Sequence, residues 1–263
     1  AGQFQMESAQ MKKAVCSLVL LWLWVHPLSG GLSAGEPAQA KSAPHWEIGL
    51  WGPLRYAWSD QVEISTHPLW FLILPNASLQ WAHGTAHGWR IFSQHGFFCP
   101  TWMLRLLRRE GIGGILSPEF NIPFLLGLNH HLRFRRAMSE RLTVAWSLGL
   151  GLGLKTAAWD ERTTIDLPVI YPRMIVFYHD YHWTTSLNLQ GPARRRWHWS
   201  LDNQVLVCPP ARAGFAYEMK GLLYWKRTPS FQIRFGYLLS YAEYPFGNQW
   251  HLLPLLDLQW RSK

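Results

Sequence analysis

The chain has 263 residues, of which 48% are hydrophobic and 15% aromatic, including 17 tryptophans. Its 25 basic and 16 acidic side chains leave a net charge of +9, yet charged residues make up only 16%, below the roughly one quarter typical of soluble domains. This composition excludes a disordered chain, which combines low hydrophobicity with high charge. After the N-terminal region, the longest purely apolar run is 69–74, far short of the about 20 residues of a spanning helix, so a helical membrane protein is also excluded.

Residues 1–40 are predicted to comprise a secretory signal peptide with extra residues in front of it. Met11-Lys12-Lys13 supplies the basic start, residues 14–25 supply the apolar core, and Ala38-Gln39-Ala40 supplies the small-x-small pattern that a signal peptidase recognises. We expect cleavage after Ala40, with cleavage after Ala34 as the alternative. Residues 41–263 are then the mature, exported chain.

The mature chain shows a period of two in its hydrophobic pattern. Between Leu142 and Lys155, bulky apolar residues occupy every even position, and small or polar residues, including Gly149, Gly151 and Gly153, occupy every odd position. A strand places all even positions on one face, whereas a helix would scatter them. The segment is about twice the usual strand length of a globular protein. Alternate glycines suit a face that looks into a crowded or watery lumen.

Similar alternation recurs along the chain, and the connections between these segments are of two kinds. The alternating segments are 122–134, 183–190, 215–220, 231–242 and 250–260. Connections at 59–60, 84–88, 136–140, 191–196 and 226–230 are uniformly short, whereas those at 52–53, 75–78, 99–120, 157–171, 208–214 and 243–249 lengthen along the chain. Tryptophans fall near many segment ends, as an interfacial girdle requires.

These features predict an all-β fold, a transmembrane antiparallel β-barrel of about 12 strands, with about 10 as the alternative count. The competing interpretation is a soluble β-sandwich or lipocalin-like barrel, which would have shorter strands and more surface charge. A helix is expected only at residues 102–110, a basic stretch in the first long connection.

The chain resembles the outer-membrane β-barrel proteins of Gram-negative bacteria. The resemblance rests on the alternations in Leu142–Lys155 and Phe231–Ala242 and on the closing segment Trp250–Trp260. It is architectural, covers the mature chain 41–263 and names no activity. It implies the cell outer membrane as the location, outer-membrane lipids and the barrel-assembly machinery as partners, and no cofactor.

Charged side chains on the predicted inner face bear on function. They are Arg133, Arg135, Lys155, Glu218, Lys220, Arg234 and Asp257. These groups either line a narrow pore or pair into a closed interior, and in a pore the basic excess would favour anionic solutes. The sequence therefore predicts a passive channel or transport-related barrel, with a lipid-modifying enzyme and a structural barrel without transport as alternatives. A nucleic-acid partner is not expected, because the positive charge is spread through the strands.

Candidate catalytic residues are few. Asp180, His182 and Ser186 are the best local set for a lipase, acyltransferase or deacylase, because they are close in sequence and share one strand face. Side chains at i and i+4 of one strand are about 13 Å apart, so this spacing gives weak support. His179 and His182 would point to opposite faces of a strand, and no metal site is expected.

Two cysteines remain after removal of the signal, Cys99 and Cys208, each followed by proline. In an exported protein they form either one disulfide or two buried free thiols, and the sequence leaves both alternatives open.

Overall fold

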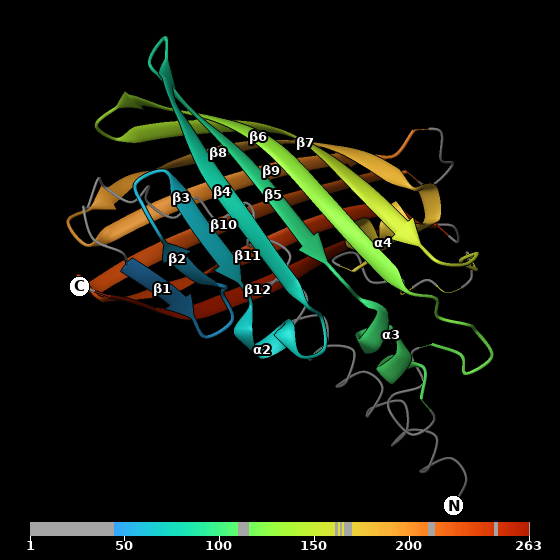
Figure 1. Ribbon diagram of the computed structural model, residues 1–263. Helices are drawn as coiled ribbons and strands as arrows, with labels where there is room; N and C mark the ends of the chain where they lie inside the picture. The colour runs from blue at the N-terminus through green and yellow to red at the C-terminus, as the bar shows by residue number, and fades with distance from the viewer. Residues whose placement is uncertain are drawn as a thin grey trace, which may run out of the picture.

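The fold is a closed antiparallel barrel (Figure 1). A computed structural model describes residues 45–109, 116–160, 163, 165, 170–209, 214–244 and 247–262, without the side chains of residues 69 and 70. The predicted signal peptide, residues 1–40, lies outside the described residues, so its cleavage stays a prediction.

Twelve strands form the wall, each hydrogen-bonded to its neighbours in sequence, with β1 closing the sheet on β12. They are β1 (His45–Gly49), β2 (Leu54–Ala57), β3 (Val62–Thr66), β4 (Asn76–Ala86), β5 (Trp89–Phe98), β6 (Leu125–Ser139), β7 (Leu142–Lys155), β8 (Tyr181–Arg194), β9 (Trp197–Val207), β10 (Phe215–Thr228), β11 (Phe231–Tyr244) and β12 (Gly247–Arg261). The predicted all-β barrel and the count of twelve rather than ten are confirmed. The first three strands have only four or five residues, so they cover only part of the height of the wall.

The two ends of the barrel differ. The five short connections lie at one end, called here the turn side, and the opposite end, with the longer connections, is called the loop side. In the part of the chain that the structure describes, three short helices lie at the loop side, namely α2 (Pro68–Phe71), α3 (Thr101–Leu107) and α4 (Tyr171–His179) (Figure 1). The helix predicted at 102–110 corresponds to α3, whereas α2 and α4 were not predicted. Within the described residues, no helix has the length and hydropathy needed to cross a bilayer.

The wall carries its apolar side chains outside and its small or polar ones inside. On β7, Leu148 and Leu154 are 44% and 53% exposed, whereas Ala145 and Ser147 are 5% and 3% exposed. Neighbouring strands continue the exposed apolar surface with Leu187, Leu223, Phe235, Leu252 and Leu256. A soluble barrel would bury such side chains, because a large contiguous apolar surface is not left in water. The outer face is therefore suited to lipid, as in transmembrane barrels.

The alternate glycines of β7 face a crowded interior. A Cβ atom on Gly149 would lie 2.3 Å from side-chain atoms of both His131 and Thr184, and one on Gly153 would lie 2.3 Å from the carbonyl oxygen of Val176 in α4. At Gly153 a larger residue would collide with the backbone of α4, whereas at Gly149 it would force the His131 and Thr184 side chains to move.

Helix α4 crosses the loop-side mouth from one wall to the other. Near its start, the Tyr171 ring centroid lies 4.9 Å from that of Tyr244 on β11. Near its end, the Phe177 ring centroid lies 5.6 Å from that of Phe98 on β5. In the strand order, β5 and β11 are six positions apart, which places them on opposite sides of a twelve-strand barrel. The helix therefore spans the lumen.

No helical signal marks α4 in the sequence, because its run of apolar, aromatic and β-branched residues is also typical of a buried strand. Pro172 lies in the first turn, where its missing N–H costs nothing, and Asp180 ends the helix in the left-handed conformation with φ of 67°. Six of the nine residues of α4 are buried. The barrel wall and the loops thus bury α4 on several sides.

An apolar cap closes the loop side around α4. It contains Leu74, Phe98, Met103, Leu104, Leu107, Leu116, Ile122, Leu125, Trp159, Ile165, Ile170, Met174, Val176 and Phe177. The cap joins residues of α3, α4 and the loops to the ends of two strands. It is the largest apolar cluster of the described residues, although it lies at one end of the barrel rather than along it.

His67 ties the ends of the first strands together. Its Nε2 lies 2.7 Å from the carbonyl oxygen of Trp51, and its backbone N–H donates to Oδ1 of Asn76 at 3.0 Å. The residue is only 1% exposed. Burial lowers the pKa of His67 below its usual value of 6.5, so the fold holds the neutral imidazole.

We expect substitution of Leu148 by arginine to lower the free energy of unfolding by about 2–4 kcal/mol, because the charge would enter the lipid-facing surface. The matched control is Leu72→Arg, since Leu72 is 86% exposed in a loop-side connection. Unfolding in urea from lipid vesicles measures both. Equal costs at the two positions would contradict a lipid-facing wall.

Acidification should destabilise the protein in part through His67. Because the pKa of His67 is depressed in the fold, the unfolded chain takes up a proton that the folded chain does not, and stability is lost as the pH falls below about 6.5. The change in melting temperature between about pH 7.5 and about pH 5 should be smaller for His67→Gln than for the wild type. An unchanged pH dependence in the variant would show that His67 contributes nothing.

Candidate functional site

The structure places the seven charged residues of the predicted inner face on the inside of the wall. They are Arg133, Arg135, Lys155, Glu218, Lys220, Arg234 and Asp257. They come from strands β6, β7, β10, β11 and β12, and their side chains meet other polar groups in layers stacked along the lumen.

The loop-side layer holds α4 in place. The guanidinium of Arg173 in α4 donates to both carboxylate oxygens of Glu218 on β10, at 2.6 and 3.0 Å. At the other end of the helix, Nζ of Lys155 on β7 donates to the carbonyl oxygen of Phe177 at 3.1 Å and lies 2.8 Å from the carboxylate of Asp180. Charged contacts thus connect α4 to two different parts of the wall.

The middle layer is a closely packed polar cross-section. Nζ of Lys220 lies 3.9 Å from Oδ2 of Asp202, and the side-chain amide of Asn188 donates to Oδ1 of the same carboxylate. The hydroxyl oxygens of Ser147 and Ser186 are 2.5 Å apart. All five residues are between 3% and 8% exposed. Polar side chains therefore fill the lumen at this level.

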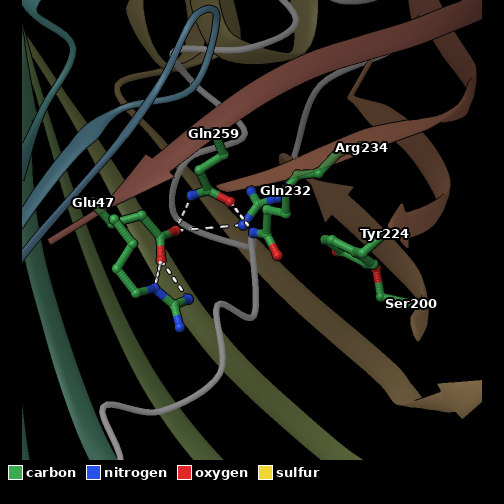
Figure 2. A network of polar contacts seen from close by, with 7 residues as sticks. Glu47, Ser200, Tyr224, Gln232, Arg234 and Gln259 are labelled. Carbon is green, nitrogen blue, oxygen red and sulfur yellow. Dashed lines mark hydrogen bonds and ion pairs between the residues drawn. The ribbon is translucent and has the colours of Figure 1, made fainter. Parts of the chain in front are cut away.

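The turn-side layer is organised around one carboxylate at the seam of the barrel. Glu47 of β1 stands opposite Arg261 of β12 and accepts from its Nη2 and Nε at 2.6 and 3.0 Å. The other carboxylate oxygen accepts from Arg234 Nη2 at 3.4 Å and from the side-chain amide of Gln259. Gln259 in turn accepts from Gln232 on β11 (Figure 2). The network joins three strands across the closure.

Arg234 also connects this network to β9 and β10. Its guanidinium carbon lies 5.1 Å from the ring centroid of Tyr224, within the range of a cation–π contact. The Tyr224 hydroxyl lies 2.7 Å from Oγ of Ser200 (Figure 2). The contacts therefore extend from the seam through β11 and β10 to β9.

Asp257 has a structural partner. Its Oδ1 accepts from the backbone N–H of Trp51 at 2.9 Å, and a Cβ atom on Gly49 would lie 2.6 Å from its Oδ2. The carboxylate therefore positions the turn between β1 and β2.

Among the described residues, the polar filling encloses a turn-side cavity and a loop-side cavity. The turn-side cavity has a volume of about 330 Å³ and is lined by the cations Arg135, Lys226, Arg234 and Arg261 and by the carboxylate of Glu140. A smaller cavity of about 80 Å³, room for a few waters, lies beneath α4 beside Arg173 and Glu218. The two cavities share no lining residue, and the middle layer lies between them.

The predicted catalytic set is not assembled. Asp180 caps α4 instead of belonging to a strand, and its carboxylate pairs with Lys155. His182 and Ser186 do share the inner face of β8, but the Ser186 hydroxyl pairs with Ser147. His179 is the last residue of α4, so the expected strand arrangement of His179 and His182 is wrong. Among the described residues, no group of three potential ligands is suited to a metal ion.

Cys99 and Cys208 are two buried free thiols. Sγ of Cys208 donates to the carbonyl oxygen of Tyr181 at 2.9 Å, and Sγ of Cys99 lies 3.7 Å from Oγ1 of Thr101. Burial, with a smaller contribution from the Asp180 charge, raises the pKa of Cys208 to about 11, so the thiol form is retained. Of the two alternatives left by the sequence, the structure has the free thiols.

Several residues of the interior were not singled out from the sequence. Glu47, Asp202 and Arg261 belong to the charged layers, and Arg173 anchors α4. For Asp202, the alternation of β9 was the available signal, since inward positions recur every second residue. For Arg173 no such signal existed, because its position depends on a helix that the sequence does not indicate.

No protein-family model matches the chain, and no curated protein matches it. Solved structures with similarity include a bacterial polysaccharide outer membrane secretin, at 11% identity and a TM-score of 0.47, covering 84% of this chain and 70% of that one. Others are the outer membrane channel DcaP of Acinetobacter baumannii (7%, TM-score 0.38, 80% and 61%) and the outer membrane protein OpdK from Pseudomonas aeruginosa (9%, TM-score 0.36, 80% and 52%). The chain therefore spans less than two thirds of the latter two.

These likenesses concern the fold alone. The closed twelve-strand topology and the apolar outer face define the protein as a transmembrane β-barrel with the architecture of outer-membrane barrels.

Replacing Glu47 by glutamine should destabilise the closed barrel by about 3–5 kcal/mol, because the buried Arg234 and the partly buried Arg261 would both lose the carboxylate that binds them across the seam. Urea unfolding and the mobility of unheated samples on denaturing gels measure the effect. Glu140→Gln serves as the control, since Glu140 is exposed at a turn and its change should cost at most about 0.5 kcal/mol. Similar losses in the two variants would argue against a special role of Glu47.

Proposed function

We propose that the protein resides in the outer membrane and forms a channel for small anionic solutes, closed by α4 and by the middle layer in the present conformation. In this proposal, outer-membrane lipids contact the apolar outer face, and the barrel-assembly machinery inserts the exported chain.

The charge of the turn-side cavity carries the proposal. Four cationic side chains line the cavity. The carboxylates are Glu140, which also lines it, and Glu47, which binds the lining residues Arg234 and Arg261, so the cations exceed the carboxylates by two. A confined lumen that is lined by charges of one sign raises the local concentration of ions of the opposite sign. Rings of arginine and lysine are also what anion-selective pores use. An anionic solute entering from the turn side would meet this cavity first.

Passage to the loop side requires α4 to move. The helix spans the mouth, and the apolar cap packs around it. It is held to the wall by the Arg173–Glu218 pair and by Lys155. Opening then corresponds to a minor conformation in which these contacts and the contacts among Lys220, Asp202 and Asn188 in the middle layer are broken.

A structural barrel without transport is the second candidate. The paired charges of the middle layer favour it, because Asp202, Lys220 and Asn188 fill the cross-section between the two cavities. Recordings of ion conductance in planar bilayers distinguish the two candidates.

Planar-bilayer recordings of the purified protein test the channel. We expect discrete, anion-preferring conductance with low open probability. Arg173→Gln should raise the open probability, because the two hydrogen bonds from Arg173 of α4 to the Glu218 carboxylate of β10 are lost. Arg135→Gln combined with Lys226→Gln should reduce the preference for anions, whereas Arg195→Gln, in an exposed turn, should leave it unchanged.

A cation preference in the wild type would overturn the anion proposal. A membrane in which both the wild type and the Arg173→Gln variant stay silent would overturn the channel and leave the structural barrel. If an alkaline carbonate wash released the protein from membranes into the soluble fraction, the proposed outer-membrane location would be refuted.

A further inference from the structure

A serine and a histidine form a hydrogen-bonded pair on the outer, otherwise apolar wall. Oγ of Ser93 on β5 lies 2.7 Å from Nε2 of His83 on β4. His83 is exposed and Ser93 half-buried, and both lie on the outer side, since Phe92 beside Ser93 is turned inward and only 8% exposed. A hydroxyl at this distance from an imidazole nitrogen has the arrangement of a nucleophile and its general base.

A β-bulge brings the pair together. The β4–β5 register passes from Ala82 to Gly84 and skips His83. In a regular ladder, the residue after Ala82 would stand opposite Ile91, a place that Gly84 takes here with φ of 117°. Bulges redirect side chains in this way and occur next to active sites. Here the extra residue allows the imidazole to reach the neighbouring strand.

Trp81 orients the imidazole. The rings of Trp81 and His83 are nearly parallel, with an interplanar angle of 6° and 6.3 Å between centroids. Trp81 is therefore a positioning residue of the pair.

We propose that Ser93 and His83 hydrolyse acyl esters of membrane lipids at the outer wall. The surroundings define the substrate class, because Trp81, Phe97 and Leu132 expose 48%, 40% and 42% of their surface on this face and offer contacts to acyl chains. The proposal is independent of the channel, since neither residue lines the lumen cavities.

A cationic group lies nearer the turn-side rim. The guanidinium carbon of Arg136 is 6.0 Å from the ring centroid of Trp89, at the start of β5. Trp89 is four residues, or about 13 Å along a strand, from Ser93. A glycerophospholipid with its phosphate at this arginine would place its ester linkages deeper along the wall, towards Ser93. A phospholipid of the turn-side leaflet is therefore the substrate that fits.

The reaction has two halves. Ser93 Oγ attacks the ester carbonyl carbon while its proton passes to Nε2 of His83, and the ester C–O bond breaks as His83 returns the proton to the leaving glycerol oxygen. Water then attacks the acyl-serine, giving one proton to His83. The released fatty acid leaves as Ser93 recovers that proton, so lipid and water yield lysolipid and fatty acid.

The test uses the full-length protein in phosphatidylethanolamine–phosphatidylglycerol vesicles. Released fatty acid is measured by mass spectrometry, and a fluorophosphonate, which loses fluoride on attack by an activated serine, is mapped to its peptide. We expect label on Ser93 and release that falls about 100-fold or more in both Ser93→Ala and His83→Gln. His95→Gln is the matched control, because His95 also faces outward but pairs with His130, at 2.9 Å between their Nδ1 atoms. Ser147→Ala controls for an inward serine, and both controls should retain wild-type release.

Absence of fluorophosphonate label on Ser93 in the wild type would overturn the proposal. This test does not depend on the folding of any variant. Release that persists in Ser93→Ala, or wild-type release no greater than in protein-free vesicles, would overturn it equally. The mobility of unheated samples on denaturing gels verifies that each compared variant is a closed barrel.

Discussion

The sheet closes on itself where β1 meets β12, and the other features of this barrel follow from that closure. In hydrocarbon, an unpaired backbone N–H or C=O costs several kcal/mol, so a spanning sheet must close on itself. Here the closure is short, because β1 and β12 share three residue pairs. Glu47 strengthens it by binding Arg261 across the seam and Arg234 on the next strand. The side chains of the interior thus compensate for a small number of backbone contacts.

Closure in lipid also reverses the usual distribution of side chains. Apolar residues such as Leu148 face outward, and the interior has to accommodate polar groups away from bulk water. Buried charges are tolerated when they are paired and hydrogen-bonded, as Glu218 is with Arg173. The apolar packing that a soluble protein would have along its centre is concentrated at the loop side, around α4.

The candidate functional features lie where the regular barrel is interrupted. Helix α4 occupies a lumen that the strands alone would leave wider, and Gly153 allows its backbone to approach β7. The bulge at His83 turns an imidazole towards Ser93 on the outer wall. One interruption concerns passage through the barrel and the other concerns chemistry at its surface, so the two proposed activities use separate parts of the molecule.

Much of the wall was predictable because strand periodicity is local. In Leu142–Lys155, each residue's face follows from its parity, and the lengths of the connections distinguish the two ends of the barrel. A crowded or watery lumen was likewise inferred from the alternate glycines, and the structure has the crowded one. The pairing of Ser93 with His83 was beyond such reasoning, because a bulge shifts the register without a distinct sequence pattern. Even-numbered positions of one strand share a face, which brought together Asp180, His182 and Ser186 as a predicted catalytic set. Asp180, however, ends helix α4 instead of belonging to the strand.

Local patterns were enough to predict the all-β class, a strand number of about twelve or ten, and which side chains of the longer strands face inward, since these features depend on neighbours a few residues apart. The assembled barrel was needed to show that residues 171–179 form a helix across the mouth, that Glu47 binds Arg261, and that Cys99 and Cys208 are free thiols. Those outcomes depend on contacts between segments up to 214 residues apart. The physical reason is that burial inside a closed barrel is a property of the assembled wall, which no single segment carries.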